Sequence, residues 1–153
     1  IVSETTNDYD LVIVAQGTTT TSAGLLMSLP EKSILWTVPV LKGFNALAEM
    51  KTLYGYAAFD AETISDWLSK IEVLDNYHFG GYGKYTADLL DFIESFYKET
   101  KIPLDPVYTA KAMFSLFKEI EQRDIKNKRI LFVHTGGIQG AKSIFEKEKR
   151  VIF

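Results

Sequence analysis

The sequence contains no cysteine and only two histidines among its 153 residues. The lack of cysteine excludes a disulfide framework, a thiolate metal site and a thiolate nucleophile. Neither His78 nor His134 has a second histidine at ligand spacing, so we expect no metal site. A cysteine-free chain is compatible with a cytoplasmic location, which is the location we expect.

The sequence also has no apolar run long enough to span a bilayer, and its Lys and Arg residues form no basic stripe. We therefore expect no membrane and no nucleic acid among its partners. The net charge is -3, with 46% hydrophobic and 24% charged residues, which is ordinary for a globular domain. The chain begins Ile1-Val2-Ser3 without Met or a signal sequence, so we expect a fragment of a longer protein.

Apolar patterns predict that buried strands alternate with helices along the chain. Nearly continuous runs rich in β-branched residues predict strands over 9–15, 33–40 and 129–134, with a short strand over 73–79. Helical spacing predicts helices over 22–29, 44–53, 61–71, 85–98, 107–122 and from about 139. In the helix over 44–53, Phe44, Leu47 and Leu53 fall on one side. This order favours a single α/β domain over residues 1–153, with a parallel sheet covered by helices on both faces.

Glycine and threonine residues follow two of the predicted strands, where ligands bind in parallel sheets. The segment Gly17-Thr18-Thr19-Thr20-Thr21-Ser22-Ala23-Gly24 has the parts of a phosphate cradle, because glycine lets the backbone turn and a helix N-terminus offers N–H groups. It contains no lysine and does not match the dinucleotide pattern Gly-x-Gly-x-x-Gly. The alternative is a turn with threonine caps.

Three further segments are weak signals one by one. Phe79-Gly80-Gly81-Tyr82-Gly83-Lys84 places an aromatic hydroxyl on a flexible loop. Asp105-Pro106-Val107-Tyr108-Thr109-Ala110-Lys111-Ala112 is a proline turn that leads into a helix, and locally it is best explained as a helix cap. His134-Thr135-Gly136-Gly137 ends a buried strand, and its glycines permit either close approach to a ligand or simply a tight turn.

Taken together, these four segments resemble one family, the D-cysteine desulfhydrase and 1-aminocyclopropane-1-carboxylate deaminase family of pyridoxal-phosphate enzymes. They occur in the family's order and spacing, and the resemblance extends from about Tyr9 to Gly137. It implies the fold-type-II architecture, of which this chain resembles part of the large domain. It also implies a pyridoxal 5'-phosphate cofactor, a small amino-acid substrate and a homodimer.

The resemblance also assigns roles to individual residues. Tyr82 and Tyr108 would flank the substrate and the cofactor ring as the catalytic pair. The cofactor-binding residues would be Gly17, Thr18, Thr20 and Thr21 at the phosphate, Thr109 at the pyridine nitrogen, and Thr135 and Gly136 on the substrate side. Thr19 departs from the family pattern, because it stands where the family usually has glycine and its Cβ restricts the loop.

Two positions separate the branches of the family. Authentic aminocyclopropane-carboxylate deaminases resemble this chain but carry Glu at the position of Thr109 and Leu at the position of Thr135. A neutral threonine at the pyridine nitrogen gives a weaker electron sink than a carboxylate does. The resemblance therefore favours β-elimination from D-cysteine, which gives pyruvate, ammonia and hydrosulfide. The alternative is the deaminase itself, which gives 2-oxobutyrate and ammonia.

The family's Schiff-base lysine matches no lysine of this chain. We expect Lys42 and Lys111 to be surface or helix-end residues, and we expect the chain alone to be inactive although its intact parent is an enzyme. The alternative to an enzyme is a non-catalytic module that retains the fold and binds a phosphate ligand or another protein.

Overall fold

A computed structural model of the chain describes residues 8–153, so the start of the chain, on which the fragment prediction depends, lies outside the described residues. Four strands form one parallel sheet in the order β3-β2-β1-β4. The strands are β1 (Leu11–Gln16), β2 (Ile34–Pro39), β3 (Ile71–Val73) and β4 (Ile130–Val133). The helices are α1 (Thr20–Met27), α2 (Ala46–Tyr56), α3 (Ala61–Ser69), α4 (Ala87–Thr100), α5 (Thr109–Gln122) and α6 (Ile138–Lys147), with the 3-10 turn η2 (Asp75–Tyr77).

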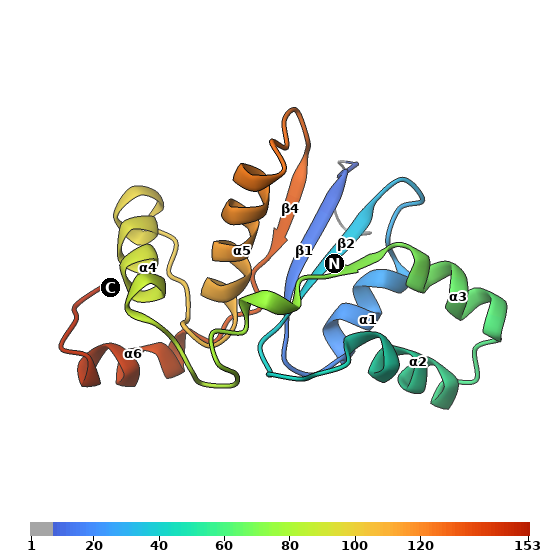
Figure 1. Cartoon of the computed structure of the whole chain (residues 1–153), viewed down its shortest axis with the longest axis horizontal. Helices are drawn as coiled ribbons and strands as arrows, with labels where there is room; N and C mark the ends of the chain where they lie inside the picture. The colour runs from blue at the N-terminus through green and yellow to red at the C-terminus, as the bar shows by residue number, and fades with distance from the viewer. Residues whose placement is uncertain (1–7) are drawn as a thin grey trace.

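Helices cover both faces of this sheet, as predicted (Figure 1). The helices α1, α2 and α3 lie on one side, and α4, α5 and α6 lie on the other. Strand β1 is buried along its whole length because it lies between β2 and β4 and has helices on both faces. Its side chains alternate between two cores: Ile13 packs in the core that includes α5, and Val12 packs in the core that includes α1.

Three of the helices begin at a side chain that caps them. Asn45, Asp60 and Thr86 accept bonds from the amides of Ala48, Thr63 and Leu89 and so begin α2, α3 and α4.

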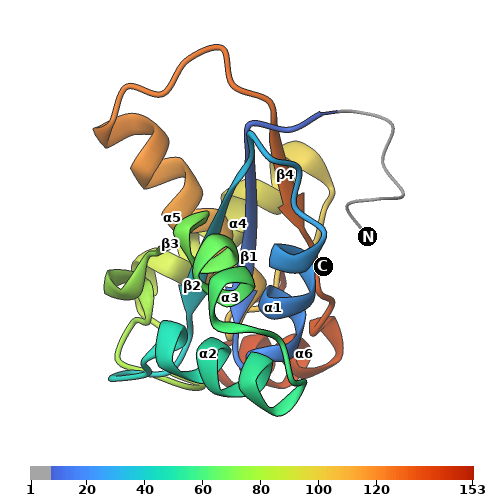
Figure 2. The same ribbon diagram turned by 90° about the vertical axis from the view of Figure 1, so that its right-hand side faces the viewer.

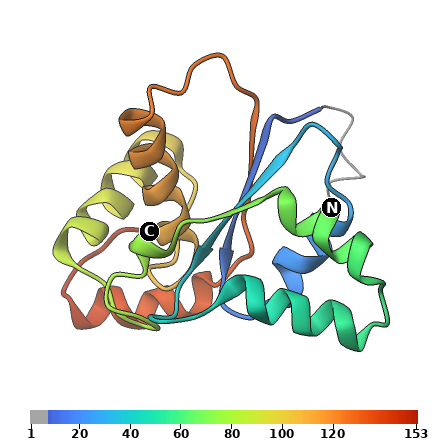
Figure 3. The same ribbon diagram turned by 45° about the vertical axis from the view of Figure 1, so that its right-hand side comes forward.

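Figure 2 shows α1, α2 and α3 together on one side of the sheet. In Figure 3 the arrowheads of β1 and β2 point toward the edge of the molecule along which α2 and α6 lie. The loops that follow the strands therefore meet at one edge.

Two predicted details are wrong. The strand expected over 73–79 lies earlier, at Ile71–Val73, because the turn-forming residues Asp75 and Asn76 begin η2 directly afterwards. In α2 the buried residues are Ala46, Met50 and Tyr54, whereas Leu47 is 42% exposed. The Tyr54 hydroxyl donates to the carbonyl of Ala23, which attaches α2 to α1.

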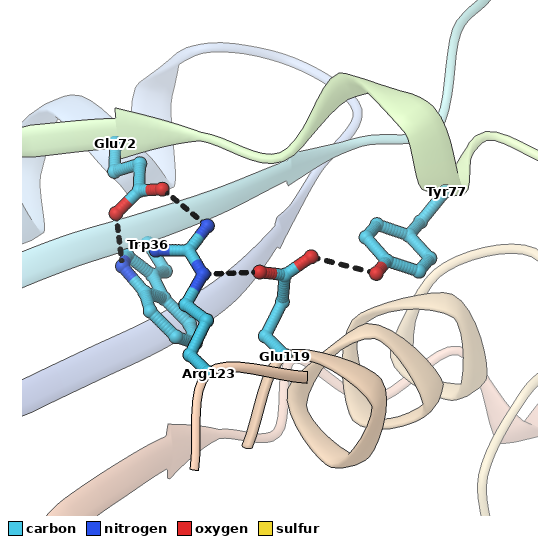
Figure 4. A network of polar contacts seen from close by, with 5 residues as sticks. All are labelled: Trp36, Glu72, Tyr77, Glu119 and Arg123. Atoms are coloured by element: carbon cyan, nitrogen blue, oxygen red, sulfur yellow. Dashed lines mark hydrogen bonds and ion pairs between the residues drawn. The ribbon is translucent and has the colours of Figure 1, made fainter. Parts of the chain in front are cut away.

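A polar network attaches the segment after α3 to α5 (Figure 4). Arg123 at the end of α5 pairs with Glu72 of β3 and with Glu119 of α5. Glu72 also accepts the indole N–H of Trp36 at 2.8 Å, and Glu119 accepts the Tyr77 hydroxyl at 2.6 Å. The network therefore joins β2, β3, η2 and α5 just before the glycine-rich loop begins.

Candidate functional site

A cavity of about 230 Å³ opens at the carboxyl ends of β1 and β4. Its walls come from three segments that are far apart in the sequence; the lining residues are Ala15, Gly17, Thr18, Thr21, Tyr108, Thr135, Gly136 and Gly137. The connection after β1 leads to β2 on one side, whereas β4 pairs with β1 on the other side. The cavity therefore lies at the topological switch point of the sheet, where α/β proteins bind ligands.

The first wall is the loop from Gly17 to the start of α1. The first backbone bond of the helix runs from the amide of Ala23 to the carbonyl of Thr19, so the preceding amides have no acceptor within the helix. The Thr19 side chain makes no capping bond, and Thr18 and Thr21 are exposed. The arrangement offers open N–H groups and hydroxyls to an anion.

Thr19, the departure from the pattern that the resemblance implies, fits this loop without backbone strain. Its φ of −74° and ψ of −20° lie in the ordinary right-handed region, which any residue adopts. The Cβ therefore does not force the loop into a new conformation.

The second wall is Tyr108, which packs directly on Gly17. A Cβ added at Gly17 would lie 2.5 Å from Cε1 of Tyr108, so this contact requires glycine. A steric need thus joins the loop after β1 to the start of α5.

Asp105 holds the turn that presents Tyr108. Its carboxylate is almost fully buried and accepts four bonds: Oδ1 from the amides of Val107 and Tyr108, and Oδ2 from the amide and the hydroxyl of Thr109. The Asp105 amide donates back to the Thr109 hydroxyl at 2.8 Å. These bonds begin α5 and fix the backbone on both sides of Tyr108.

Tyr82 completes an aromatic pair with Tyr108. The ring centroids are 5.9 Å apart and the planes lie at 71°, an edge-to-face contact. The Tyr82 phenol and burial, together with the nearby Asp105, raise the pKa of Tyr108 to about 12. The Tyr108 hydroxyl therefore keeps its proton at neutral pH.

The third wall is the turn after β4. His134 Nδ1 accepts from the amide of Gly136, and Nε2 lies 2.8 Å from the carbonyl of Pro103, to which it donates. Gly136 and Gly137 both have φ of +88°, a conformation that glycine tolerates best. A Cβ at Gly137 would also lie 2.9 Å from Asp105 Oδ2, so this turn packs closely against the turn before α5.

A buried polar cluster lies at the end of β1. Thr37 donates to Gln16 Oε1 at 2.6 Å, and the hydroxyl of Ser22 in α1 lies 3.3 Å from that of Thr37. Gln16 Nε2 is buried without a partner among the described residues. The cluster links β1, β2 and α1 next to the loop that begins at Gly17.

Lys42 is exposed and Lys111 lies in the first turn of α5, so both fit the prediction of a surface or helix-end residue, but Lys111 is buried rather than on the surface. The Lys111 side chain is fully buried, and its ammonium donates to the carbonyls of His78 and Gly81, both at 2.9 Å. Burial lowers the pKa of Lys111 to about 8, although nearby Asp105 acts in the opposite direction. The side chain turns inward because these two carbonyls lie within its reach.

The structure brings together most of the residues singled out in the sequence. Gly17, Thr18, Thr21, Tyr108, Thr135 and Gly136 line the cavity, and Tyr82 contacts Tyr108. Thr20 and Thr109 are not part of its lining; Thr20 is exposed on α1, and Thr109 is fully buried with its hydroxyl bonded to Asp105. The roles that the resemblance assigns to all these residues stay predictions.

The sequence reasoning missed Asp105, Lys111 and Gly137. An Asp-Pro turn four residues before a threonine was a signal for Asp105, because Asp side chains bind the amides that follow them. Gly137 belongs to the motif that follows β4, but its contact with Asp105 depends on tertiary structure. No lysine lines the cavity. Within residues 8–153, no cluster of three or more His, Asp or Glu side chains could hold a metal ion, and no helix is long and apolar enough to cross a membrane.

Comparison with known proteins supplies the remaining evidence, although no family model matches the chain. Two archaeal proteins are named "Putative 1-aminocyclopropane-1-carboxylate deaminase". The one from Pyrococcus furiosus is 32% identical over 136 residues, which are 87% of this chain and 41% of that protein. The one from Pyrococcus horikoshii is 35% identical over 147 residues, which are 92% of this chain and 43% of that protein.

A solved structure agrees with these sequence relatives. It is described as a crystal structure of an aminocyclopropane-carboxylate (ACC) deaminase homologue and superposes with a TM-score of 0.71 at 25% identity, covering 96% of this chain and 45% of that chain. This chain thus spans less than half the length of the relatives that it matches. It belongs to the 1-aminocyclopropane-1-carboxylate deaminase family.

Proposed function

We propose that this chain forms the phosphate-binding and tyrosine-bearing side of the active site of a pyridoxal-phosphate-dependent lyase or deaminase. One observation carries the proposal: a single cavity combines the open start of α1 with Tyr108, which immediately precedes α5 and contacts the ring of Tyr82. The family relationship supports the cofactor class, and the cavity is at the switch point where α/β folds bind ligands.

The residues present suit the cofactor phosphate. Gly17 has no Cβ and so lets Tyr108 pack against the loop, and the amides that begin α1 have no helical acceptors. Thr18 and Thr21 add hydroxyl donors at the cavity wall. At about 230 Å³, the cavity is smaller than the roughly 300–1,000 Å³ of complete ligand pockets. The chain would therefore hold the phosphate end and contact one side of the substrate.

The cofactor, when bound, supplies the electron sink that stabilises negative charge on the substrate. The chain's own contribution is to bind and orient. Tyr108 keeps its phenolic proton at neutral pH, so its hydroxyl is a donor that Tyr82 and the Asp105 turn hold in place. Thr135 and Gly136 form the opposite wall, where the substrate would lie.

Within the family, the neutral cavity favours β-elimination over ring opening. No carboxylate lines it, and the nearby carboxylate of Asp105 already accepts four hydrogen bonds. Thr109 would donate to the pyridine nitrogen only by releasing Asp105, because its single proton already makes that bond at 2.7 Å. A weak electron sink suits D-cysteine, whose hydrosulfide is a good leaving group.

The decisive test uses the full-length protein that contains this chain, loaded with pyridoxal phosphate. Incubation with D-cysteine should release pyruvate, ammonia and hydrosulfide, whereas 1-aminocyclopropane-1-carboxylate should give little 2-oxobutyrate. The reverse product pattern would favour the deaminase. A full-length protein that binds the cofactor but releases neither ketoacid would contradict both.

The module hypothesis is supported by the absence of a lysine from the cavity lining. Its test is the coding sequence upstream of this chain. A lysine followed by an Asn-bearing turn, a domain's length before Ile1, would exclude the module, and its absence would favour it.

The phosphate site can be tested on the chain itself. Titration with inorganic phosphate, followed by amide NMR, should shift the resonances of Thr18 to Thr21. Gly24 lies one turn further along α1 and serves as an internal reference. Equal shifts throughout the chain, or none, would contradict the assignment of this loop.

A further inference from the structure

We propose that Lys111 is a positioning residue, whose buried ammonium fixes the loop that carries Tyr82. The family relationship assigns no role to this side chain, and it lies outside the cavity lining. The significance of Tyr82 for catalysis depends on the proposed function, but the attachment of its loop to Lys111 does not.

The loop from His78 to Lys84 consists of two consecutive turns. The amide of Gly81 donates to the carbonyl of His78 at 3.0 Å, and the amide of Lys84 donates to the carbonyl of Gly81 at 3.1 Å. Lys111 donates to the same two carbonyls, at 2.9 Å each. One ammonium therefore binds the first carbonyl of each turn and holds the two turns together. Tyr82 lies within the second turn, between Gly81 and Lys84.

Ordering this loop has a high entropic cost, because three of its residues are glycines and a fourth, Phe79, has a positive φ. Phe79 has φ of +53°, and Gly80, Gly81 and Gly83 have φ of +95°, +120° and +65°. Such a glycine-rich stretch loses much backbone entropy on folding. Contacts from other parts of the chain must therefore hold it in one conformation. The aromatic ring of Phe79 packs on Phe114 of α5, but Tyr82 itself is 60% exposed and has little packing to hold it.

The burial of Lys111 is unfavourable for stability, which points to a specific role. Its side chain is fully buried, and within residues 8–153 no carboxylate forms an ion pair with it. A buried charge without an ion-pair partner costs more free energy than an apolar side chain of similar size. The ammonium is bonded instead to the one loop whose tyrosine contacts Tyr108.

The two ends of α5 thus hold the segment after β3 in different ways. The Arg123 network attaches β3 and η2 near the helix C-terminus (Figure 4), and Lys111 attaches the glycine-rich loop near the N-terminus. Tyr108 immediately precedes the same helix. Since α5 also carries Lys111, the same helix fixes the positions of both tyrosines.

The test is hydrogen–deuterium exchange of the loop amides in Lys111→Met, which keeps the volume of the side chain but removes the donors. We expect the amides of Gly81 and Lys84 to exchange at least about tenfold faster, as loss of charge-assisted bonds implies. The nuclear Overhauser contact between the rings of Tyr82 and Tyr108 should weaken in parallel. Lys118→Met, a half-exposed lysine on the same helix, should leave both unchanged.

A second measurement needs no variant. Acetylation of the folded chain by a water-soluble amine reagent should modify Lys84 and Lys118 readily and Lys111 at least about tenfold more slowly, because its amine is buried and bonded. The proposal is overturned if Lys111→Met folds with unchanged loop exchange, or if Lys111 is labelled as fast as Lys84.

Failure of the proposed function would be seen separately. In the cofactor-loaded full-length protein, Lys111→Met should lower kcat with little effect on KM, in the same direction as Tyr82→Phe, whereas Lys118→Met should not. If the wild type is inactive while the exchange and labelling results hold, the proposed function fails and the positioning of the loop by Lys111 stands.

Discussion

Replacement of Gly17 by alanine tests the contact on which the candidate site depends. The new Cβ would lie 2.5 Å from Cε1 of Tyr108, whereas carbon atoms in contact are ordinarily about 3.5–4.0 Å apart. The ring must therefore move by about 1 Å. Overpacking of this kind costs about 1–3 kcal/mol, and we expect about 1–2 kcal/mol here because the half-buried ring can move toward solvent.

Urea unfolding followed by tryptophan fluorescence measures this loss, since Trp36 and Trp67 pack in the two separate cores. Gly24→Ala is the matched control: nothing lies within 4 Å of its added Cβ, and alanine in the interior of α1 should stabilise the chain by up to about 1 kcal/mol. In a Tyr108→Ala background the cost of Gly17→Ala should nearly vanish, because its three nearest atoms all belong to Tyr108. A cost that persists in that background, or no cost in the wild type, would refute the packing argument.

Four further predictions concern charged groups. Asp105→Asn should cost about 2–3 kcal/mol in urea unfolding, because one amide group cannot accept all four bonds of a buried carboxylate. Arg123 holds the pKa of Glu72 below 4.5. The ion pair should therefore stabilise the fold above pH 4.5, and this stabilisation should be lost as the pH falls through the lowered pKa. In Glu72→Gln the free energy of unfolding should depend less on pH in this acid range. Lys111 has a pKa of about 8 in the folded chain against 10.5 in the unfolded chain, so between these values the unfolded chain binds more protons. The melting temperature should therefore rise with pH in this range. Thermal unfolding of Lys111→Met should lack this rise. Finally, borohydride reduction of the chain incubated with pyridoxal phosphate should fix the cofactor to no single lysine, as peptide mass mapping would show; a specific adduct at one lysine would place the cofactor-bearing residue in this chain.

The architecture was predictable because its signals are local. Leu11 to Ala15 form an apolar run that suits a strand buried on both faces, and the helical periodicities of α4 and α5 give their positions to within a few residues. The prediction was wrong where local signals compete. In the segment after α3, the β-branched residues Ile71 and Val73 favour a strand, but Asp75 and Asn76 end it at once.

The candidate site was predictable only in part. Its glycines and threonines follow strand ends, and in a parallel sheet the carboxyl ends of strands share one edge, so Gly17 and Gly136 could be expected near each other. What holds Tyr108 in place was not visible, because it depends on the burial of Asp105 and on the space beside Gly17. Lysine is rarely buried, so the inward position of Lys111 could not be expected from its type.

Lys111 shows why a lowered pKa does not by itself mark a reactive amine. A lysine that carries a cofactor needs a neutral amine and access to the cavity. Burial gives Lys111 a pKa of about 8, but the same burial excludes it from the cavity wall and places its three donors against two backbone carbonyls. To react with a carbonyl compound the amine would have to leave both turns, and the loop with Tyr82 would then lose its attachment to α5. The structural use of this lysine and a covalent use therefore exclude each other, so under the proposed function Lys111 would not be the residue that carries the cofactor.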